Sequence, residues 1–130
     1  MQSWLAGVGA LYGGLAVLLG AFGAHGLKSR LDEDLLTSFE TGVRYQFYHA
    51  LALLLCAAMA PTLKPGLLKG AGACFVTGTF LFSGSIYLLA TRQMLPFGSL
   101  RFLGPVTPVG GVLLIVGWCL LAAAAWGLQR

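Results

Sequence analysis

The chain has 130 residues, enough for one domain, and only 9% of them are charged while 58% are hydrophobic. That is too little charge to cover a water-facing surface, because soluble domains carry about 25% charged residues. The net charge of +4 comes from eight Lys and Arg residues scattered between apolar stretches, which excludes a basic nucleic-acid-binding face. The composition therefore predicts an integral membrane protein.

Four apolar stretches are long enough to cross a bilayer, which takes roughly 20 residues in a helix. They predict spans at about 4–25, 43–61, 67–90 and 103–128. The first stretch has no positively charged region before it, so we expect a retained span and not a signal peptide. The sequence predicts an all-α membrane protein in which residues 1–130 form a single transmembrane domain, a bundle of four transmembrane helices.

The connection between the first two predicted spans holds all four acidic residues of the chain. Within it, Leu31, Leu35, Leu36 and Phe39 recur at helical spacing, opposite the acidic positions. This pattern predicts a short amphipathic helix at the membrane interface.

Polar side chains gather at the start of the second predicted span. They are Arg44, Tyr45, Gln46, Tyr48 and His49. Glu40 precedes Arg44 by four residues, the order that favours an ion pair on a helix. If the helix begins near Thr41, His49 lies about 12 Å along its axis, deep enough in the membrane to need a partner.

Two interpretations of His49 remain open. It could handle protons or bind a ligand or metal, or it could form a structural hydrogen bond between helices. His25 leaves the first span on the side where the second begins, so we expect His25 and His49 to approach each other. A haem or metal pair is one alternative, but no third ligand and no haem-attachment sequence accompany them, so we predict no cofactor and no metal site.

The last two predicted spans carry three further candidate site residues, Ser83, Ser85 and Thr107. Their hydroxyls could line a substrate path, or they could bond locally to the backbone. Thr107 lies between Pro105 and Pro108, a sequence that loosens the start of a helix, as in the broken helices of transporters.

Glycine is abundant, with 19 residues, and lets membrane helices approach closely. The predicted helix-packing positions are Gly9, Gly13, Gly20, Gly23, Gly66, Gly70, Gly78, Gly84, Gly110 and Gly111. Tyr87 lies near a span end and fits an aromatic belt, whereas the indole N–H of Trp118, nearer the middle of its span, needs a partner.

Four motifs occur in order: Gly20-Ala-Phe-Gly-Ala-His25, Tyr45-Gln-Phe-Tyr-His49, Leu81-Phe-Ser-Gly-Ser-Ile-Tyr87 and Thr107-Pro-Val-Gly-Gly111. Together they resemble the small membrane-protein family known as domain of unknown function 423, which includes YgdD-like proteins and transmembrane protein 256. The resemblance covers nearly the whole chain. It implies a four-span, multi-pass protein of the bacterial inner membrane, and it implies no established activity.

The leading functional hypothesis is a non-enzymatic membrane protein, either an oligomer or an accessory subunit of another membrane protein. Its expected partners are membrane lipids and other membrane proteins or copies of itself, with no nucleic acid. The alternatives are a small transporter, channel or lipid-binding protein that uses the His, Tyr and Ser side chains, and a haem- or metal-binding membrane protein.

Overall fold

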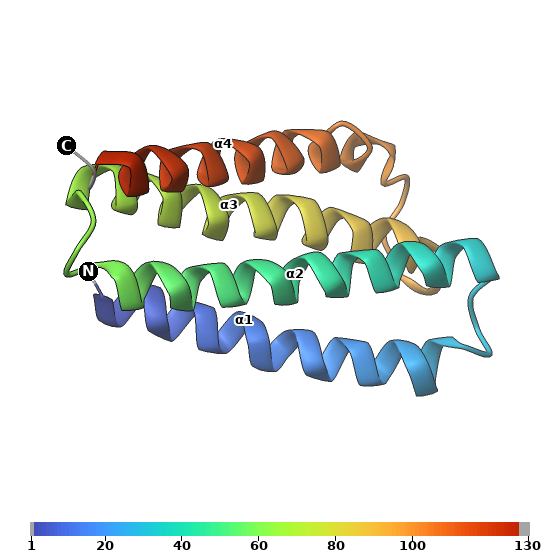
Figure 1. Ribbon diagram of the computed structural model, residues 1–130. Coiled ribbons are helices and arrows are strands. Elements are labelled where there is room, and N and C mark those ends of the chain that lie inside the picture. The colour runs from blue at the N-terminus through green and yellow to red at the C-terminus, as the bar shows by residue number, and fades with distance from the viewer. Residues whose placement is uncertain (1, 128–130) are drawn as a thin grey trace.

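The computed structural model describes residues 2–127, which form four long helices. Their bounds are α1 Gln2–Phe22, α2 Glu33–Met59, α3 Pro65–Ala90 and α4 Val106–Trp126. A π-helical turn, Gly23–Leu27, prolongs α1, and two short 3₁₀ turns lie between α3 and α4. The helices run side by side in alternating directions, with both ends of the chain at one end of the bundle (Figure 1). This arrangement confirms the predicted all-α, four-helix class.

Helix boundaries follow local sequence signals. Pro65 occupies the first position of α3, where its missing N–H leaves no intrahelical bond unmade. The connection after α3 contains Pro96 and Gly98, which do not favour a continued helix. The short connection between α2 and α3 makes these helices antiparallel neighbours.

Three of the helical segments are long and apolar enough to cross a membrane: Ser3–Leu27, Pro65–Ala90 and Arg101–Trp126. The other helix, α2, carries charged residues in its first half, but residues 45–59 contain no Asp, Glu, Lys or Arg. This second half of α2 lies alongside the other helices (Figure 1). Residue 128, the predicted end of the fourth span, lies outside the described residues.

The predicted short interfacial helix is not a separate element, and this prediction is wrong. Its residues from Glu33 onward form the first turns of α2, which is continuous to Met59, and Asp32 is the N-cap. Leu36 and Phe39 pack with Leu27 and Ala90 in a small hydrophobic cluster at this end of the bundle. The apolar face therefore covers protein, and its residues stay in phase with the buried face of the rest of α2.

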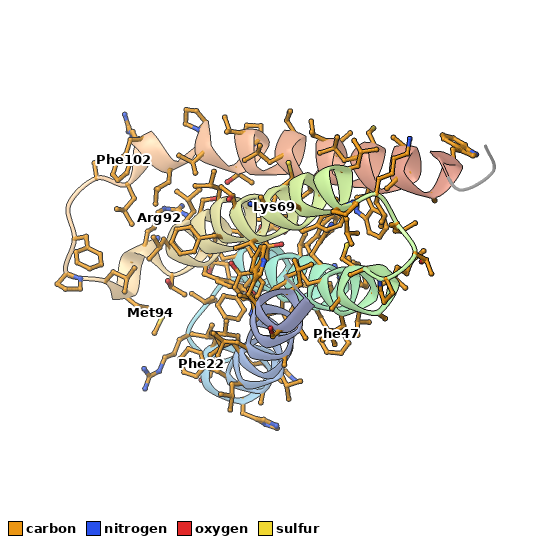
Figure 2. The ribbon with its side chains drawn as sticks, turned by 90° about the vertical axis from the view of Figure 1, so that its left-hand side faces the viewer. Phe22, Phe47, Lys69, Arg92, Met94 and Phe102 are labelled. Carbon is orange, nitrogen blue, oxygen red and sulfur yellow. The ribbon has the colours of Figure 1, made fainter. Side chains whose placement is uncertain are left out.

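The helices are layered in chain order, so that α1 and α4 lie on opposite sides of α2 and α3 (Figures 1 and 2). A second, larger hydrophobic cluster occupies the end of the bundle that holds the chain termini. Its largest buried members are Leu5, Leu53, Leu68 and Phe75. Most of the polar side chains of the interior lie between the two clusters, where the candidate site is found.

Candidate functional site in the bundle interior

Gln46 lies at the centre of the polar interior and joins three helices. Its side-chain Nε2 donates to the carbonyl oxygen of Tyr12 in α1 at 2.8 Å. Its Oε1 accepts from the hydroxyl of Tyr87 in α3 at 2.7 Å. The residue is buried, with 6% of its surface exposed. Both ends of the amide are therefore occupied by neighbouring helices.

Two more hydrogen bonds reinforce this junction. The Tyr12 hydroxyl donates to the carbonyl oxygen of Val76 at 2.9 Å, which links α1 to α3. The Ser83 hydroxyl donates to the carbonyl oxygen of Gly42 at 2.7 Å, which links α3 to α2. Gly42 permits this approach, because a Cβ there would lie 2.8 Å from the Tyr87 ring.

His49 connects α2 to α4 through Nε2, while its Nδ1 bonds within α2. The indole N–H of Trp118 donates to Nε2 at 3.1 Å, so Nε2 carries no proton in this arrangement. Nδ1 then holds the ring proton and donates to the carbonyl oxygen of Tyr45 at 2.7 Å. Phe75 packs against both rings, with centroids 5.6 Å from His49 and 5.1 Å from Trp118. The imidazole is neutral and fully hydrogen-bonded.

Ser85 and Thr107 join α3 to α4 near the start of α4. Ser85 Oγ donates to the carbonyl oxygen of Phe82 at 3.0 Å and lies 2.5 Å from Thr107 Oγ1. Because the single proton of Ser85 is used on Phe82, Thr107 is the donor in the pair. The two hydroxyls thus form a helix-to-helix link beside the proline-flanked start of α4.

Two crevices border this interior, on different sides of α2. One, of about 220 Å³, lies between α1 and α3 and is lined by Tyr12, Gln46, Thr79 and Tyr87 among others. The hydroxyl of Thr79 is buried and has no hydrogen-bond partner among residues 2–127. The other crevice, of about 410 Å³, lies between α2 and α4 beside His49 and Trp118. The two crevices share no lining residue.

The expected approach of His25 and His49 is wrong. His25 is exposed in the π-helical turn after α1. The neighbouring Gly23 faces Phe39, and His49 lies ten residues further along α2, about 15 Å away at 1.5 Å per residue. The helices run antiparallel, so the end of α1 meets the beginning of α2, not its middle.

The structure does not gather every predicted polar residue into the interior. Tyr45 and Tyr48 are exposed on α2, and their rings lie 5.8 Å apart between centroids. Arg44 is also exposed, and its Nη2 donates to Thr41 Oγ1 at 3.3 Å. Within residues 2–127 no carboxylate oxygen lies within 4.0 Å of it, so the expected pair with Glu40 is not formed.

Most of the predicted helix-packing glycines face a neighbouring helix. A Cβ added to any of them would lie within 4 Å of another helix: Gly9, Gly13, Gly20, Gly23, Gly70, Gly78, Gly110 and Gly111. Gly66 and Gly84 take no part in this packing within one chain, because a Cβ at either would meet nothing within 4 Å among the described residues. These two glycines point away from the neighbouring helices.

The predictions from the sequence missed some interior residues and assigned others to the wrong place. Tyr12 carries a hydroxyl in the middle of a charge-free span, a position that itself indicates a need for a partner. Tyr87 was assigned to an aromatic belt but bonds to Gln46. Gly72 and Gly117 were missed as packing positions, although a Cβ at Gly117 would lie 2.7 Å from the Phe75 ring.

The geometry offers no ready metal centre among the residues described. Within residues 2–127, no group of three or more His, Cys, Asp and Glu side chains is placed to hold an ion. A metal at His49 Nε2 would have to displace the indole of Trp118. Most of the interior polar side chains are used in hydrogen bonds that join helices.

The fold and interior define a class: a small multi-pass membrane protein whose helices are joined by buried side-chain hydrogen bonds. Comparison with known proteins then identifies its family. The chain belongs to the family described as protein of unknown function (DUF423), which matches residues 19–111. This confirms the resemblance drawn from the four ordered motifs.

Relatives occur in bacteria and in yeast. The chain is 42% identical to the UPF0382 membrane protein YwdK of Bacillus subtilis over 119 residues, covering 91% of this chain and 92% of the relative. It is 40% identical to a UPF0382 membrane protein, SAB0533, of Staphylococcus aureus, with 92% of each chain covered. It is 46% identical to the UPF0382 membrane protein C1782.12c of Schizosaccharomyces pombe over 116 residues, covering 85% of this chain and 92% of the relative. No solved structure gives a significant match.

Proposed function

We propose that this protein is a non-enzymatic membrane subunit that acts by assembling with copies of itself or with another membrane protein. The observation that carries the proposal is the use of the interior polar groups. Gln46, Ser83, His49, Ser85 and Thr107 each bond to another helix. Groups engaged in this way stabilise the bundle and are not free to act on a substrate.

The layered arrangement of the helices supports assembly. Since α1 packs mainly on α2, its outer side is left without a helix neighbour. Gly7, Ala10 and Gly14 are exposed there, and their spacing places them on one face of the helix. A face of small residues lets a second helix approach closely in a membrane. We propose this face of α1 as the contact between subunits.

Cysteine cross-linking in native membranes tests the assembly. The three native cysteines, Cys56, Cys74 and Cys119, are first replaced by alanine, since Cys119 is exposed and would itself cross-link. Ala10→Cys then places one thiol on the outer face of α1, and Val112→Cys places a control thiol on exposed α4. We expect oxidation to give a dimer with Ala10→Cys and none with Val112→Cys.

Native mass spectrometry of the protein extracted with its lipids gives the second readout. A homo-oligomer or a complex with another membrane protein supports the proposal. A monomer that carries a small organic molecule, lost on Gln46→Leu, would contradict it and would favour a binding or transport function.

One observation favours that second candidate, a small transporter, channel or lipid-binding protein. The unpartnered hydroxyl of Thr79 lines the crevice between α1 and α3, where a polar group of a small molecule could bond to it. The test measures the flux of small solutes into proteoliposomes that contain wild type or Thr79→Val. A flux that changes in Thr79→Val indicates a transport path through this crevice, and no flux in either indicates a bundle without such a path.

We further propose that the protein resides in the inner membrane of a bacterium. The relatives named membrane proteins in Bacillus and Staphylococcus support a bacterial membrane, while the fission-yeast relative extends the family beyond bacteria. Separation of inner-membrane, outer-membrane and soluble fractions, with detection of the native protein, tests it.

A further inference from the structure

A groove runs along the outside of the bundle between α1 and α2. It has a volume of about 310 Å³, at the lower end of the range of about 300–1,000 Å³ for ligand pockets. Small residues of α1, Ala16, Gly20 and Ala21, leave the space open. Phe47 and Tyr48 of α2 form the opposite wall, and Figure 2 labels Phe47 beside α1.

Arg44 is the only charged residue among those that line this groove. Its guanidinium is exposed and makes one hydrogen bond, to the neutral hydroxyl of Thr41. No carboxylate within residues 2–127 lies close enough to form an ion pair with it. The groove therefore combines an apolar lining with a cation that no carboxylate of the described residues neutralises.

The depth of Arg44 makes a counter-charge valuable. Val43 faces Gly20, so Arg44 lies level with Gly20 and Ala21 of α1. Beyond Ala21 the apolar residues of α1 continue for three residues, about 4.5 Å, before the exposed His25. An arginine at such a position extends its head toward the interface and pairs with an anion, and lipid phosphates are the anions present there.

We propose that this α1–α2 groove is a binding site for one anionic phospholipid. A phosphate oxygen of the lipid accepts hydrogen bonds from the Arg44 guanidinium, whose planar donors match phosphate geometry. An acyl chain lies along Ala16, Gly20 and Ala21. Arg44 is the only charged residue that lines the groove, so a lipid with a net negative charge neutralises it and a zwitterionic lipid does not, and we expect the groove to favour net anionic lipids. This site lies further along α1 than the proposed subunit contact on Gly7, Ala10 and Gly14 and shares no residue with it.

Native mass spectrometry of protein released from nanodiscs of equal phosphatidylglycerol and phosphatidylcholine tests the site. We expect wild type to retain one phosphatidylglycerol in preference to phosphatidylcholine. Arg44→Gln should weaken this retention about tenfold or more, the effect of losing a charge-assisted hydrogen bond. The matched control is Arg101→Gln, which removes the same charge at the same end of the bundle but between α3 and α4 (Figure 1).

A second variant tests the groove without altering charge. Ala21→Trp places a large side chain in the α1–α2 groove from an exposed position, so we expect the fold to persist and lipid retention to fall. Equal retention in wild type, Arg44→Gln and Arg101→Gln would overturn the proposal. Loss in Arg44→Gln with full retention in Ala21→Trp would also overturn it, because the lipid would then not occupy the groove. The same spectra report the number of chains in each species, so lipid retention is compared between species with the same number of chains.

Discussion

The helices of this protein are held together in two different ways in two regions of the bundle. Between α3 and α4 the backbones themselves meet. A Cβ at Gly110 would overlap the backbone nitrogen of Phe82 and lie 2.8 Å from its Cα. A Cβ at Gly78 would lie 3.0 Å from the backbone nitrogen of Leu114. This seam depends on the absence of side-chain atoms.

Between α1 and α3 the backbones stand further apart, and polar side chains bridge the space. Tyr12, Gln46 and Tyr87 form the bridge, beside a crevice of about 220 Å³. This region depends on the presence of particular donors and acceptors. The comparison teaches that a membrane bundle can be joined by close packing or by hydrogen bonds, and that the two kinds of seam should respond differently to substitution.

The largest effect is expected in the close seam. Gly110→Ala puts a methyl group where the backbone of Phe82 lies, and neither helix can yield without moving the other. Overpacking of this kind typically costs about 1–3 kcal/mol, and we expect the upper end because the obstacle is backbone. Thermal unfolding of the purified protein in detergent, followed by circular dichroism, measures the loss. An unchanged melting temperature would mean that the helices are not this close.

The bridged region should respond less to a single change. Gln46→Leu keeps the side-chain volume roughly constant but removes both hydrogen bonds and leaves the Tyr87 hydroxyl without an acceptor. We expect the free energy of unfolding to fall by about 1–3 kcal/mol, the cost of a buried unsatisfied group. Gln93→Leu, on the exposed connection after α3, is the matched control and should have no effect. If Gln46→Leu matches this control, the amide does not join the helices.

A double-mutant cycle refines that test. Tyr87→Phe removes the hydroxyl that donates to Gln46, so the double variant should cost less than the sum of the two single variants. Additive losses would indicate that the two side chains act separately.

The link between α2 and α4 should show the next smaller effect. Trp118→Phe retains an aromatic ring against Phe75 but removes the N–H that donates to His49. Hydrogen bonds between membrane helices contribute about 0.6 kcal/mol on average and up to about 1.7 kcal/mol, and we expect a loss in that range. Chemical unfolding in mixed micelles resolves differences of this size. A gain in stability would show that the indole N–H is not bonded in the folded protein.

The sequence predicts the helices of this fold well, because a helix that crosses a bilayer must be long and apolar. Length and hydrophobicity can be read directly from the residues of each segment. It also locates the polar side chains that need partners at membrane depth, including His49 and Trp118. Their partners could not be predicted, because a hydrogen bond between helices depends on how each helix is rotated and offset along its neighbour. The mistaken approach of His25 to His49 came from this missing offset.

The glycines make the same point more sharply. A small-residue spacing shows that a helix can be approached closely on one face, but not that another helix lies there. Gly84 sits at the expected spacing and faces open space, whereas Gly42 and Gly117, which were not singled out, receive the rings of Tyr87 and Phe75. Such contacts are set by tertiary packing, which the local sequence does not encode.

The smallest effect on stability is expected at a glycine that does not pack against another helix of the same chain. A Cβ at Gly14, on the outer face of α1, would meet nothing within 4 Å. Gly14→Ala should therefore leave the monomer unstrained and stabilise α1 by up to about 1 kcal/mol, because alanine favours a helix more than glycine does. Melting of the monomeric protein in detergent checks this, with Gly110→Ala as the contrasting variant. In membranes, the added methyl group would hold the two α1 helices of the proposed subunit contact further apart. We therefore expect Gly14→Ala to reduce the disulfide cross-linking of the Ala10→Cys variant. A loss of monomer stability with no change in cross-linking would instead place Gly14 in a seam within the chain, and the contrast between the two kinds of glycine would fail.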